Sequence, residues 1–405
     1  MPRLKNDCAY FILFIILLFL WRYSRPNKSQ RIVGKLLENM EIDCEKPDED
    51  FEFNGKSIEE IIRNSNDKCG DIQAFFDFHE NSTSKEEEDY PLAYGILAHK
   101  DITQLLFMLS AIYQPQNVFC VAYPENADKD FIKILIEIKH CWSNIHIFER
   151  PKIEWGGFEI INSVYFCLDY LTKLNHDWKY YQYLSGVDVP LNTNLEMVRI
   201  FKAMNDSPNF EVTKYEEYRY MSKSKSESPL PLWKSSLSCL IPRKTAKSLI
   251  SSSMPENLFN FINGTKIPDE SFWGTLLGNK DLFNVPGSIN ASEFIKYKNA
   301  NNGNSNYYIS RYQIWDYSNC YGIFVSGSCV FGVNDLWHLR DSKHLIAHKL
   351  YLDYQPAAYF CLLREHRKRT FHPNTSFATI FYSELPQVEL LNGKNYNNLT
   401  HPDWL

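Results

Sequence analysis

Two adjacent acidic residues stand at the centre of the segment GTKIPDESFWGTL, residues 264–276. Asp269 and Glu270 directly follow a proline, and a phenylalanine and a tryptophan come one residue later. A solvated acidic turn needs no such apolar packing behind it, whereas a carboxylate that must face a bound molecule does. A carboxylate held in this way is suited to act as a general base. The ordinary alternative is an acid in the first turn of a helix, where proline and carboxylates are both favourable.

A basic stretch, DLWHLRDSKHLIAHK at 335–349, is the second candidate group, and we expect it to be helical. Five of its basic side chains follow closely on one another: Arg340, Lys343, His344, His348 and Lys349. Such charge can stabilise a departing phosphate. The sequence contains no glycine-rich phosphate loop, no serine nucleophile elbow and no paired CxxC motif. Acid turn and basic stretch together therefore favour sugar transfer from a nucleotide donor.

The elements that must position these residues alternate between strand and helix patterns. Four short apolar runs have the length of strands: 92–99, 117–124, 144–150 and 180–191. Four segments repeat apolar residues at helical spacing: 101–113, 128–141, 157–174 and 194–204. This alternation predicts an α/β domain with a mostly parallel sheet. Ligands of such sheets bind at the carboxyl ends of the strands, which here carry His99, Pro124, Glu125, Arg150 and Asp188.

Residues 205–265 are irregular in pattern, apart from one amphipathic segment at 233–262. The sequence DKD at 128–130 is similar to the acidic motif of metal-dependent sugar transferases. It opens a predicted helix, however, where acids simply favour the helix dipole. We therefore expect neither a bound metal nor another cofactor.

Several motifs, in their order along the chain, resemble the core-2/I-branching β-1,6-N-acetylglucosaminyltransferase family over roughly residues 90–365. The similar stretches are LAYGILAHKD, LLFMLSAIYQPQNVFCV, YYQYLSGVDVPLNTNLEMV, IPDESFWGTL, NVPGS, CVFGVNDL and LIAHK. The resemblance implies a glycosyltransferase-A-like fold and inverting, metal-independent transfer from a UDP-sugar. It further implies N-acetylglucosamine as the sugar and a galactose or N-acetylgalactosamine of an O-glycan as the acceptor, joined in a β-1,6 branch.

The resemblance also implies roles for single residues. Glu270 matches the catalytic base, and Lys349 matches a lysine that contacts the UDP diphosphate. The other donor-binding residues that we expect are Leu97, His99, Trp155 and Arg340. The acceptor-binding residues that we expect are Glu211, Tyr312 and Trp315.

The chain departs from the family at three positions. Ser326 stands where the family has an arginine that contacts the diphosphate, so Arg340 or Arg311 would have to supply that charge. Pro124 replaces an aspartate, and Ile314 replaces a tyrosine that contacts the acceptor. These departures leave a second function open, that of a non-catalytic lumenal protein that binds glycans or interacts with other proteins.

Ten cysteines favour an oxidising compartment. The resemblance implies four disulfides: Cys44–Cys361, Cys69–Cys141, Cys120–Cys167 and Cys320–Cys329. Cys8 and Cys239 are left over. Seven N-x-S/T sequons favour the same compartment, at Asn27, Asn81, Asn205, Asn263, Asn290, Asn374 and Asn398.

The uninterrupted apolar run at 9–21 is expected to be a signal-anchor transmembrane helix. It would follow a cytoplasmic tail at 1–8 and precede a lumenal stem at 22–88 and a catalytic domain at 89–405. The basic residues that follow the run favour the opposite orientation, but the cysteines and sequons favour a lumenal domain. We therefore expect a single-pass type II Golgi membrane protein that binds a UDP-sugar and a glycan or glycoprotein acceptor. The net charge of −6 argues against a nucleic-acid partner.

Overall fold

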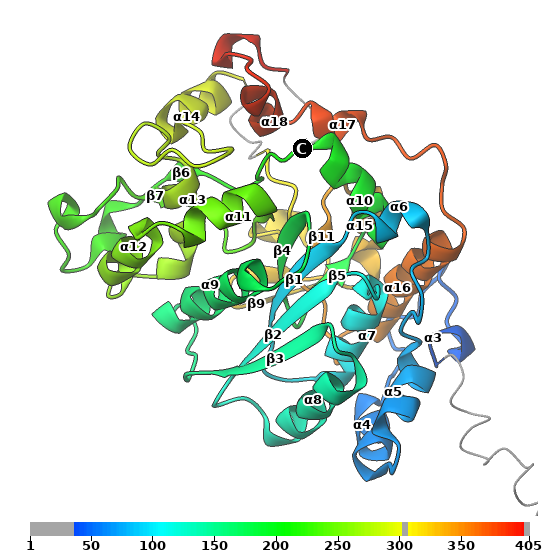
Figure 1. Ribbon diagram of the computed structural model, residues 1–405. Coiled ribbons are helices and arrows are strands. Elements are labelled where there is room, and N and C mark those ends of the chain that lie inside the picture. The colour runs from blue at the N-terminus through cyan, green and yellow to red at the C-terminus, as the bar shows by residue number, and fades with distance from the viewer. Residues whose placement is uncertain (1–35, 302–306, 401–405) are drawn as a thin grey trace, which may run out of the picture.

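The computed structural model describes residues 36–301 and 307–400 of the 405-residue chain. Its centre is a five-stranded sheet in the order β3-β2-β1-β4-β8 (Figure 1). Strands β1 (Leu92–Leu97), β2 (Val118–Pro124), β3 (Ile145–Arg150) and β4 (Tyr180–Ser185) are parallel. Strand β8 (Leu240–Pro242) pairs antiparallel with β4. The mostly parallel α/β sheet predicted from the sequence is confirmed.

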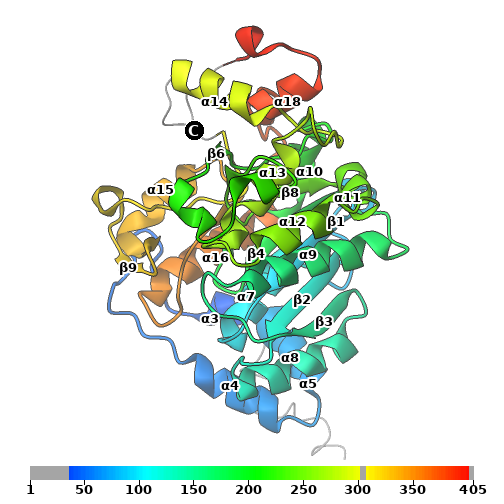
Figure 2. The same cartoon turned by 90° about the vertical axis from the view of Figure 1, so that its left-hand side faces the viewer.

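The two faces of this sheet have separate apolar cores, because alternate side chains of a strand point to opposite faces. On β1, Tyr94 and Ile96 belong to one core and Ala93 to the other. The first core is covered by α7 (Ile102–Ile112), α8 (Lys129–Cys141), α10 (Asn194–Ala203) and α16 (Pro356–Phe371). The second is covered by α9 (Phe158–Lys173), α11 (Arg243–Ile250), α12 (Met254–Ile262), α13 (Phe272–Leu277) and α14 (Ala291–Ala300). The sheet is therefore the middle one of three layers (Figures 1 and 2).

Side-chain caps explain where the helices around the sheet begin. The Asp101 carboxylate accepts the backbone N–H of Gln104 at 2.9 Å at the start of α7. Asp128 accepts two backbone N–H groups at the start of α8, at 2.9 and 2.8 Å. Thr193 and Glu196 form a reciprocal capping box at the start of α10. These caps satisfy backbone donors that a helix end leaves unpaired, so the periodic segments begin close to where the sequence predicts.

The region expected to be a stem is folded against the domain in its described part. It contains α3 (Leu36–Asn39), α4 (Gly55–Asn64), α5 (Lys68–Phe76) and α6 (Lys85–Glu88). Ile62, Ile72 and Phe76 are fully buried in the first core, and Figure 2 shows α4 and α5 beside α8. Residues 36–88 therefore form part of the packed domain rather than an extended spacer, because their apolar side chains have a face of α7 and α8 to cover.

The structure contains the four expected disulfides: Cys44–Cys361, Cys69–Cys141, Cys120–Cys167 and Cys320–Cys329. The first two join the N-terminal helical region to α16 and α8. The third joins β2 to α9, and the fourth lies at the hairpin of β9 (Ile323–Val325) and β10 (Ser328–Val330). Cys239 is buried with a free thiol.

Three expected elements are divided in the structure. The run 180–191 forms β4 and, after a turn, the two-residue β5 (Val189–Pro190), because the Asp188 carboxylate accepts the Ser185 N–H at 2.7 Å and folds the chain back. The basic stretch 335–349 is not one helix. Its α15 (Leu336–Asp341) ends early, and β11 (Ile346–Ala347) pairs antiparallel with the distant β5. The segment 233–262 likewise divides into β7 (Trp233–Lys234), β8, α11 and α12.

The remaining elements are short: β6 (Thr213–Lys214), α17 (Ile380–Ser383), α18 (Pro386–Leu391) and the 3₁₀ helices η1 (Glu217–Tyr220), η2 (Lys225–Glu227), η3 (Pro268–Glu270), η4 (Tyr317–Asn319), η5 (Val333–Asp335) and η6 (Tyr396–Asn398). Within residues 36–301 and 307–400, no helix is both long enough and apolar enough to cross a membrane. The expected anchor at 9–21, Cys8 and Asn27 lie outside the described residues. Five other sequon asparagines are exposed: Asn81, Asn205, Asn263, Asn374 and Asn398. Asn290 is half-buried, and its amide donates to Asp281 at 2.8 Å.

Candidate active site

Strands β2 and β3 lie on one side of β1, and β4 lies on its other side, so the order in which successive strands join the sheet reverses at β1. In open α/β sheets, ligands bind at the carboxyl ends of the strands beside such a switch point. Leu97 ends β1, and its carbonyl accepts the N–H of Gly186, which follows β4, at 3.1 Å. His99 and Lys100 come directly after β1 and are exposed. The expected donor residues Leu97 and His99 therefore lie at the edge of the sheet where a ligand is expected.

The acid turn is the 3₁₀ helix η3, and it is anchored by buried aromatic rings. Phe272 and Trp273 are fully buried directly behind it. The ring of Phe272 stacks on Phe259, with 4.4 Å between centroids. The carbonyl of Glu270 accepts the backbone N–H of Ser235 at 2.7 Å. This packing fixes the turn and explains why large apolar residues follow the two carboxylates in the sequence.

The Glu270 carboxylate is held by a buried arginine. Arg219, whose side chain is only 4% exposed, donates from Nη2 to Glu270 Oε2 at 2.8 Å and from Nε to Glu216. Within the described residues, Oε1 of Glu270 accepts no hydrogen bond. One oxygen is thus fixed and the other is available. Sequence reasoning missed Arg219 because it treated residues 205–265 as irregular surface, where the charged run EEYR was the only signal.

Glu211 belongs to the same electrostatic environment. Burial raises the pKa of its carboxyl group, the charge of Glu270 raises it further, and the charges of Lys298 and Lys234 oppose the increase. A carbon added to Gly274, four residues after Glu270, would lie 3.4 Å from the carbonyl oxygen of Glu211, so the expected acceptor residue lies beside the helix that follows the acid turn.

Asp269 is a buried acid beside Glu270. It is 8% exposed, and its Oδ1 is buried without a hydrogen-bond partner within the described part of the chain. Burial, followed by the charge of Glu270, raises the pKa of Asp269 to about 7. Asp269 is therefore protonated at acidic pH, whereas the base beside it is held by an arginine.

Lys349 is a buried cation that is held by a backbone carbonyl. It is 5% exposed, and its ammonium group donates to the carbonyl of Val325 at 2.6 Å. Among the described residues no carboxylate pairs with it. Burial, followed by the charge of Lys100, lowers the pKa of Lys349. The Nζ atoms of Lys349 and Lys100 lie 5.7 and 5.2 Å from the ring centroid of Tyr351.

The carbonyl that receives Lys349 belongs to a tight turn between β9 and β10. Ser326 and Gly327 have positive φ angles of 50° and 82°, as expected for a two-residue hairpin turn. A carbon added to Gly327 would lie 3.7 Å from the ring of Trp315, so this tryptophan covers the turn. Ser326, which stands where the family has an arginine, directly follows Val325, whose carbonyl accepts the hydrogen bond of Lys349.

A buried charge network fixes the backbone next to Lys349. Asp188 is completely buried and accepts from Arg311 at 2.8 Å and from His348 Nδ1 at 2.7 Å. Arg311 also lies over the ring of Tyr183, 5.3 Å from its centroid. Burial, with the charge of Arg311, lowers the pKa of His348 to about 4, so its imidazole is neutral near pH 7. Arg311 is therefore engaged inside the domain.

The expected donor residue Arg340 is also engaged elsewhere. It donates to Glu365 at 2.5 Å and to the carbonyl of Cys44 at 3.0 Å. These contacts attach the N-terminal region to α16. The donor-binding role, which the position of Arg340 close to Lys349 in the sequence suggests, stays a prediction.

The remaining expected residues differ in accessibility. Trp155 is 76% exposed on the loop before α9, and its neighbour Gly156 packs near Ile267, which precedes the acid turn. Trp315 is 59% exposed. Tyr312 is half-buried and packs on Phe331, with 5.7 Å between ring centroids. The two tryptophans are thus free to contact a ligand, whereas much of Tyr312 belongs to the core.

The acidic pair at 128–130 is used for local structure. Asp128 caps α8, and Asp130 pairs with Lys133 at 2.9 Å and with Arg63 at 3.8 Å. In the described ranges, no group of three or more His, Cys, Asp or Glu side chains could hold a metal ion.

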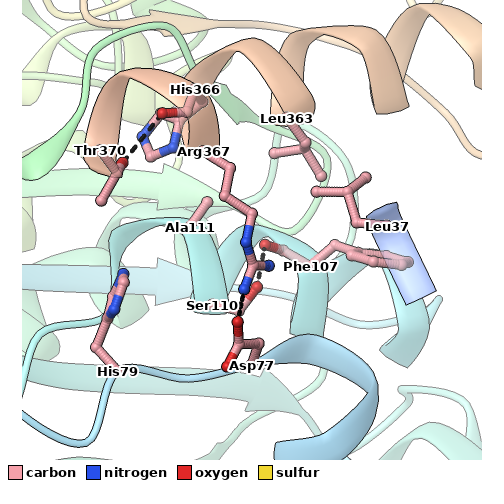
Figure 3. A pocket seen from close by; sticks show the side chains of 10 residues that line it. All are labelled: Leu37, Asp77, His79, Phe107, Ser110, Ala111, Leu363, His366, Arg367 and Thr370. Atoms are coloured by element: carbon pink, nitrogen blue, oxygen red, sulfur yellow. Dashed lines mark hydrogen bonds and ion pairs between the residues drawn. The ribbon is translucent and has the colours of Figure 1, made fainter. Parts of the chain in front are cut away.

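Two pockets lie away from all of these residues. Figure 3 shows a small cavity of about 20 Å³, crossed by the ion pair of Arg367 and Asp77. It has room for about one water molecule. A second, open pocket of about 290 Å³ is lined by Tyr90, Trp178, Lys179, Asp206, Arg243, Lys244 and Lys247. Three of these residues adjoin the beginning of β4 or the end of the antiparallel β8, which is the opposite edge of the sheet from the candidate site.

Comparison with known proteins identifies similar sequences. The sequence model of the core-2/I-branching enzyme family matches residues 92–319. A Bos taurus β-1,3-galactosyl-O-glycosyl-glycoprotein β-1,6-N-acetylglucosaminyltransferase is 28% identical over 72% of this chain and 73% of its own length. A Homo sapiens N-acetyllactosaminide β-1,6-N-acetylglucosaminyl-transferase is 28% identical over 71% of this chain and 75% of its own length. The crystal structure of S. aureus TarS 1–349 aligns with 42% of this chain and 56% of its own, at a TM-score of 0.25 and 11% identity, which supports no conclusion.

Proposed function

Because this chain belongs to the core-2/I-branching enzyme family and is a glycosyltransferase, we propose that it moves N-acetylglucosamine from a UDP donor to an O-glycan. The acceptor is a galactose or N-acetylgalactosamine residue, and the product carries a β-1,6 branch. The similar enzymes named above, which are β-1,6-N-acetylglucosaminyltransferases, support this choice of donor and linkage.

The observation that carries the proposal is the state of Glu270. One oxygen is fixed by the buried Arg219 at 2.8 Å, and the other accepts no hydrogen bond within the described residues. A general base needs a defined position and a free lone pair. In the proposed reaction the free oxygen takes the proton of the acceptor hydroxyl. The acceptor oxygen then bonds to the anomeric carbon from the face opposite UDP, which inverts the configuration.

The leaving diphosphate needs positive charge, because it gains the electron pair of the broken carbon–oxygen bond. Lys349 is suited to this role, since it is buried, held by the Val325 carbonyl, and without a carboxylate partner in the described part of the chain. We propose that this lysine takes the place of a metal ion. The engagement of Asp128 and Asp130 in local contacts supports that choice.

We also propose that the folded domain lies in the lumen of the Golgi, on a single-pass type II anchor. Four disulfides support an oxidising compartment, and five exposed sequon asparagines are accessible to glycosylation. Two measurements would test this orientation: a fall in the apparent mass of the protein when an endoglycosidase removes its glycans, and protection of the domain from protease in intact vesicles. A protein that is unglycosylated and digested in intact vesicles would contradict it.

The direct test of function uses the full-length protein purified in detergent. It is incubated with UDP-N-acetylglucosamine and a β-1,3-galactosyl-N-acetylgalactosamine acceptor, and both UDP release and the linkage of the product are measured. We expect a β-1,6-linked product from the unmodified chain and none from Glu270→Gln. Binding of the glycan without any transfer would instead support the non-catalytic alternative, which the serine at position 326 favours.

A further inference from the structure

The surroundings of Tyr351 contain an excess of positive charge. Both Lys100 and Lys349 place their ammonium groups within 6 Å of its ring centroid, at 5.2 and 5.7 Å. Neither lysine forms an ion pair with a described carboxylate. Two acids are in electrostatic range, but Asp101 uses Oδ1 to cap α7, and Asp353 forms no ion pair with either lysine in the described part of the chain. Neither ammonium group therefore has a direct ion-pair partner in the described part of the chain.

Lys349 is the buried member of this pair, and both its burial and the nearby charge of Lys100 disfavour its charged form. The cation–π contact with Tyr351 offsets only part of this cost. An anion with more than one negatively charged group would remove both the burial cost and the repulsion.

The position of Lys100 fits the diphosphate of the donor. It follows β1, at the switch point where ligands of parallel sheets bind, and it shares the ring of Tyr351 with the lysine assigned to the diphosphate. The two arginines that the sequence offers as replacements for the missing family arginine are engaged elsewhere, Arg311 with the buried Asp188 and Arg340 with Glu365. Lys100 forms no ion pair with any residue that the structure describes.

We propose that Lys100 is the second cation of the donor site and contacts the diphosphate of UDP together with Lys349. This inference rests on the proposed function. During transfer the bond between the anomeric carbon and the diphosphate oxygen breaks, and its electron pair stays on that oxygen. The acceptor proton moves to Glu270 as the new carbon–oxygen bond forms. Lys100 and Lys349 keep their protons throughout and pair with the charge that develops on the diphosphate.

The experiment compares how tightly the full-length protein binds three probes that differ in phosphate content: UDP, UMP and uridine. Titration calorimetry is carried out on the unmodified chain, on Lys100→Ala, and on Lys100→Arg, which keeps the charge. Lys280→Ala is the matched control, since Lys280 is also exposed and forms no ion pair within the described residues. Thermal unfolding of each variant without ligand reports whether it folds.

We expect Lys100→Ala to bind UDP about tenfold more weakly, as for the loss of one charge-assisted hydrogen bond. The same substitution should weaken the binding of UMP less than that of UDP and should leave the binding of uridine unchanged. Lys100→Arg should bind UDP almost as tightly as the unmodified chain. Lys280→Ala should bind all three probes as the unmodified chain does. Because the lost charge repels Lys349, Lys100→Ala should also unfold at no lower temperature than the unmodified chain.

Three results would overturn the inference, and they differ in what they mean for the proposed function. If the unmodified chain binds UDP and Lys100→Ala binds it equally well, Lys100 has no part in the donor site, while the proposed function stands. The same conclusion follows if Lys100→Ala weakens uridine as much as UDP. If the unmodified chain binds no uridine nucleotide, both the inference and the proposed function fail.

Discussion

The acid turn and the lysine pair at Tyr351 handle charge in opposite ways. At the acid turn, Glu270 has a buried arginine as its partner, and its own carbonyl is anchored by a backbone amide. At Tyr351, two lysines share a ring and no described carboxylate pairs with either of them. At the acid turn, one oxygen of the Glu270 carboxylate pairs with Arg219, and the other accepts no hydrogen bond within the described residues. The second site has no direct ion-pair partner for either lysine among the described residues, so a bound anion could pair with both.

This difference separates the two tasks of the proposed reaction. A base must be positioned before the acceptor arrives, and a fixed partner does that without removing its free oxygen. A site for a leaving group must instead bind charge more strongly as the reaction proceeds, and fixed counter-charges in the protein would weaken it. We therefore expect changes at the acid turn to affect the rate of transfer and changes at the lysines to affect the binding of UDP.

The largest effect is expected for Glu270→Gln. The amide is nearly isosteric with the carboxylate but cannot accept the proton, so the transfer rate should fall by about 10²- to 10⁴-fold. The affinity for UDP should be unchanged, because the loss is at the acid turn alone. Turnover numbers and UDP dissociation constants, measured on the same preparations, would check this. Normal turnover in the variant would remove Glu270 from the mechanism.

A smaller effect, of the opposite kind, is expected for Lys349→Met. Methionine keeps an apolar side chain of similar length and removes only the charge, so the fold should be retained. UDP affinity should fall by about 10- to 100-fold, the range for a lost charge-assisted hydrogen bond. The comparison between the two sites would break down if this variant bound UDP normally and lost only turnover.

The acid turn can also be examined through stability, by means of Asp269→Asn. The pKa of Asp269 is raised to about 7 from its ordinary value of 3.8, so the folded chain binds more protons than the unfolded chain between these values. The Asp269 carboxyl group therefore costs stability progressively as the pH rises from 3.8 to about 7, and the cost is constant above that. Asparagine removes this cost, which is about 4 kcal/mol at most.

Denaturant unfolding at several pH values would measure this effect. We expect Asp269→Asn to match the unmodified chain near pH 4 and to be more stable than it above pH 7. Equal stability at every pH would mean that Asp269 is not held protonated, and an effect that grows towards low pH would reverse the assigned sign.

The smallest effect is expected from metal removal. If lysines balance the leaving diphosphate, a chelator should leave the transfer rate unchanged, and added manganese should not increase it. The measurement is the initial rate with EDTA, with and without an excess of manganese. Loss of activity in EDTA that manganese restores would show that the lysine pair is not sufficient.

The sequence predicts the region from β1 to α10 well and the rest of the chain less well, for a physical reason. Between residues 92 and 204 each element carries its own periodicity, and helices begin at local caps such as Asp101 and Asp128. The later elements depend on distant partners. Strand β11 forms because β5 lies beside it, and no pattern within 335–349 contains that information.

The site follows the same rule. Glu270 and its aromatic anchors are adjacent in the sequence, so the acid turn is recognisable from the order of its residues alone. Arg219 contacts Glu270, which lies 51 positions further along the chain. Lys100 contacts Tyr351, which is separated from it by most of the domain. Neither contact can be read from the order of the residues. Arg340 lies near Lys349 along the chain, and its pairing with Glu365 is a contact that its position in the sequence does not reveal.

The bond between Cys44 and Cys361 has a consequence for the making of the protein. The two cysteines are 317 positions apart, and a ribosome adds roughly 5–20 residues per second. Cys44 therefore leaves the ribosome roughly 15 to 60 seconds before its partner does, by the same rate. During that interval seven other cysteines emerge, and each is a possible wrong partner for Cys44: Cys69, Cys120, Cys141, Cys167, Cys239, Cys320 and Cys329. Early formation of the three disulfides among them, or repair by a disulfide isomerase, would favour the correct product.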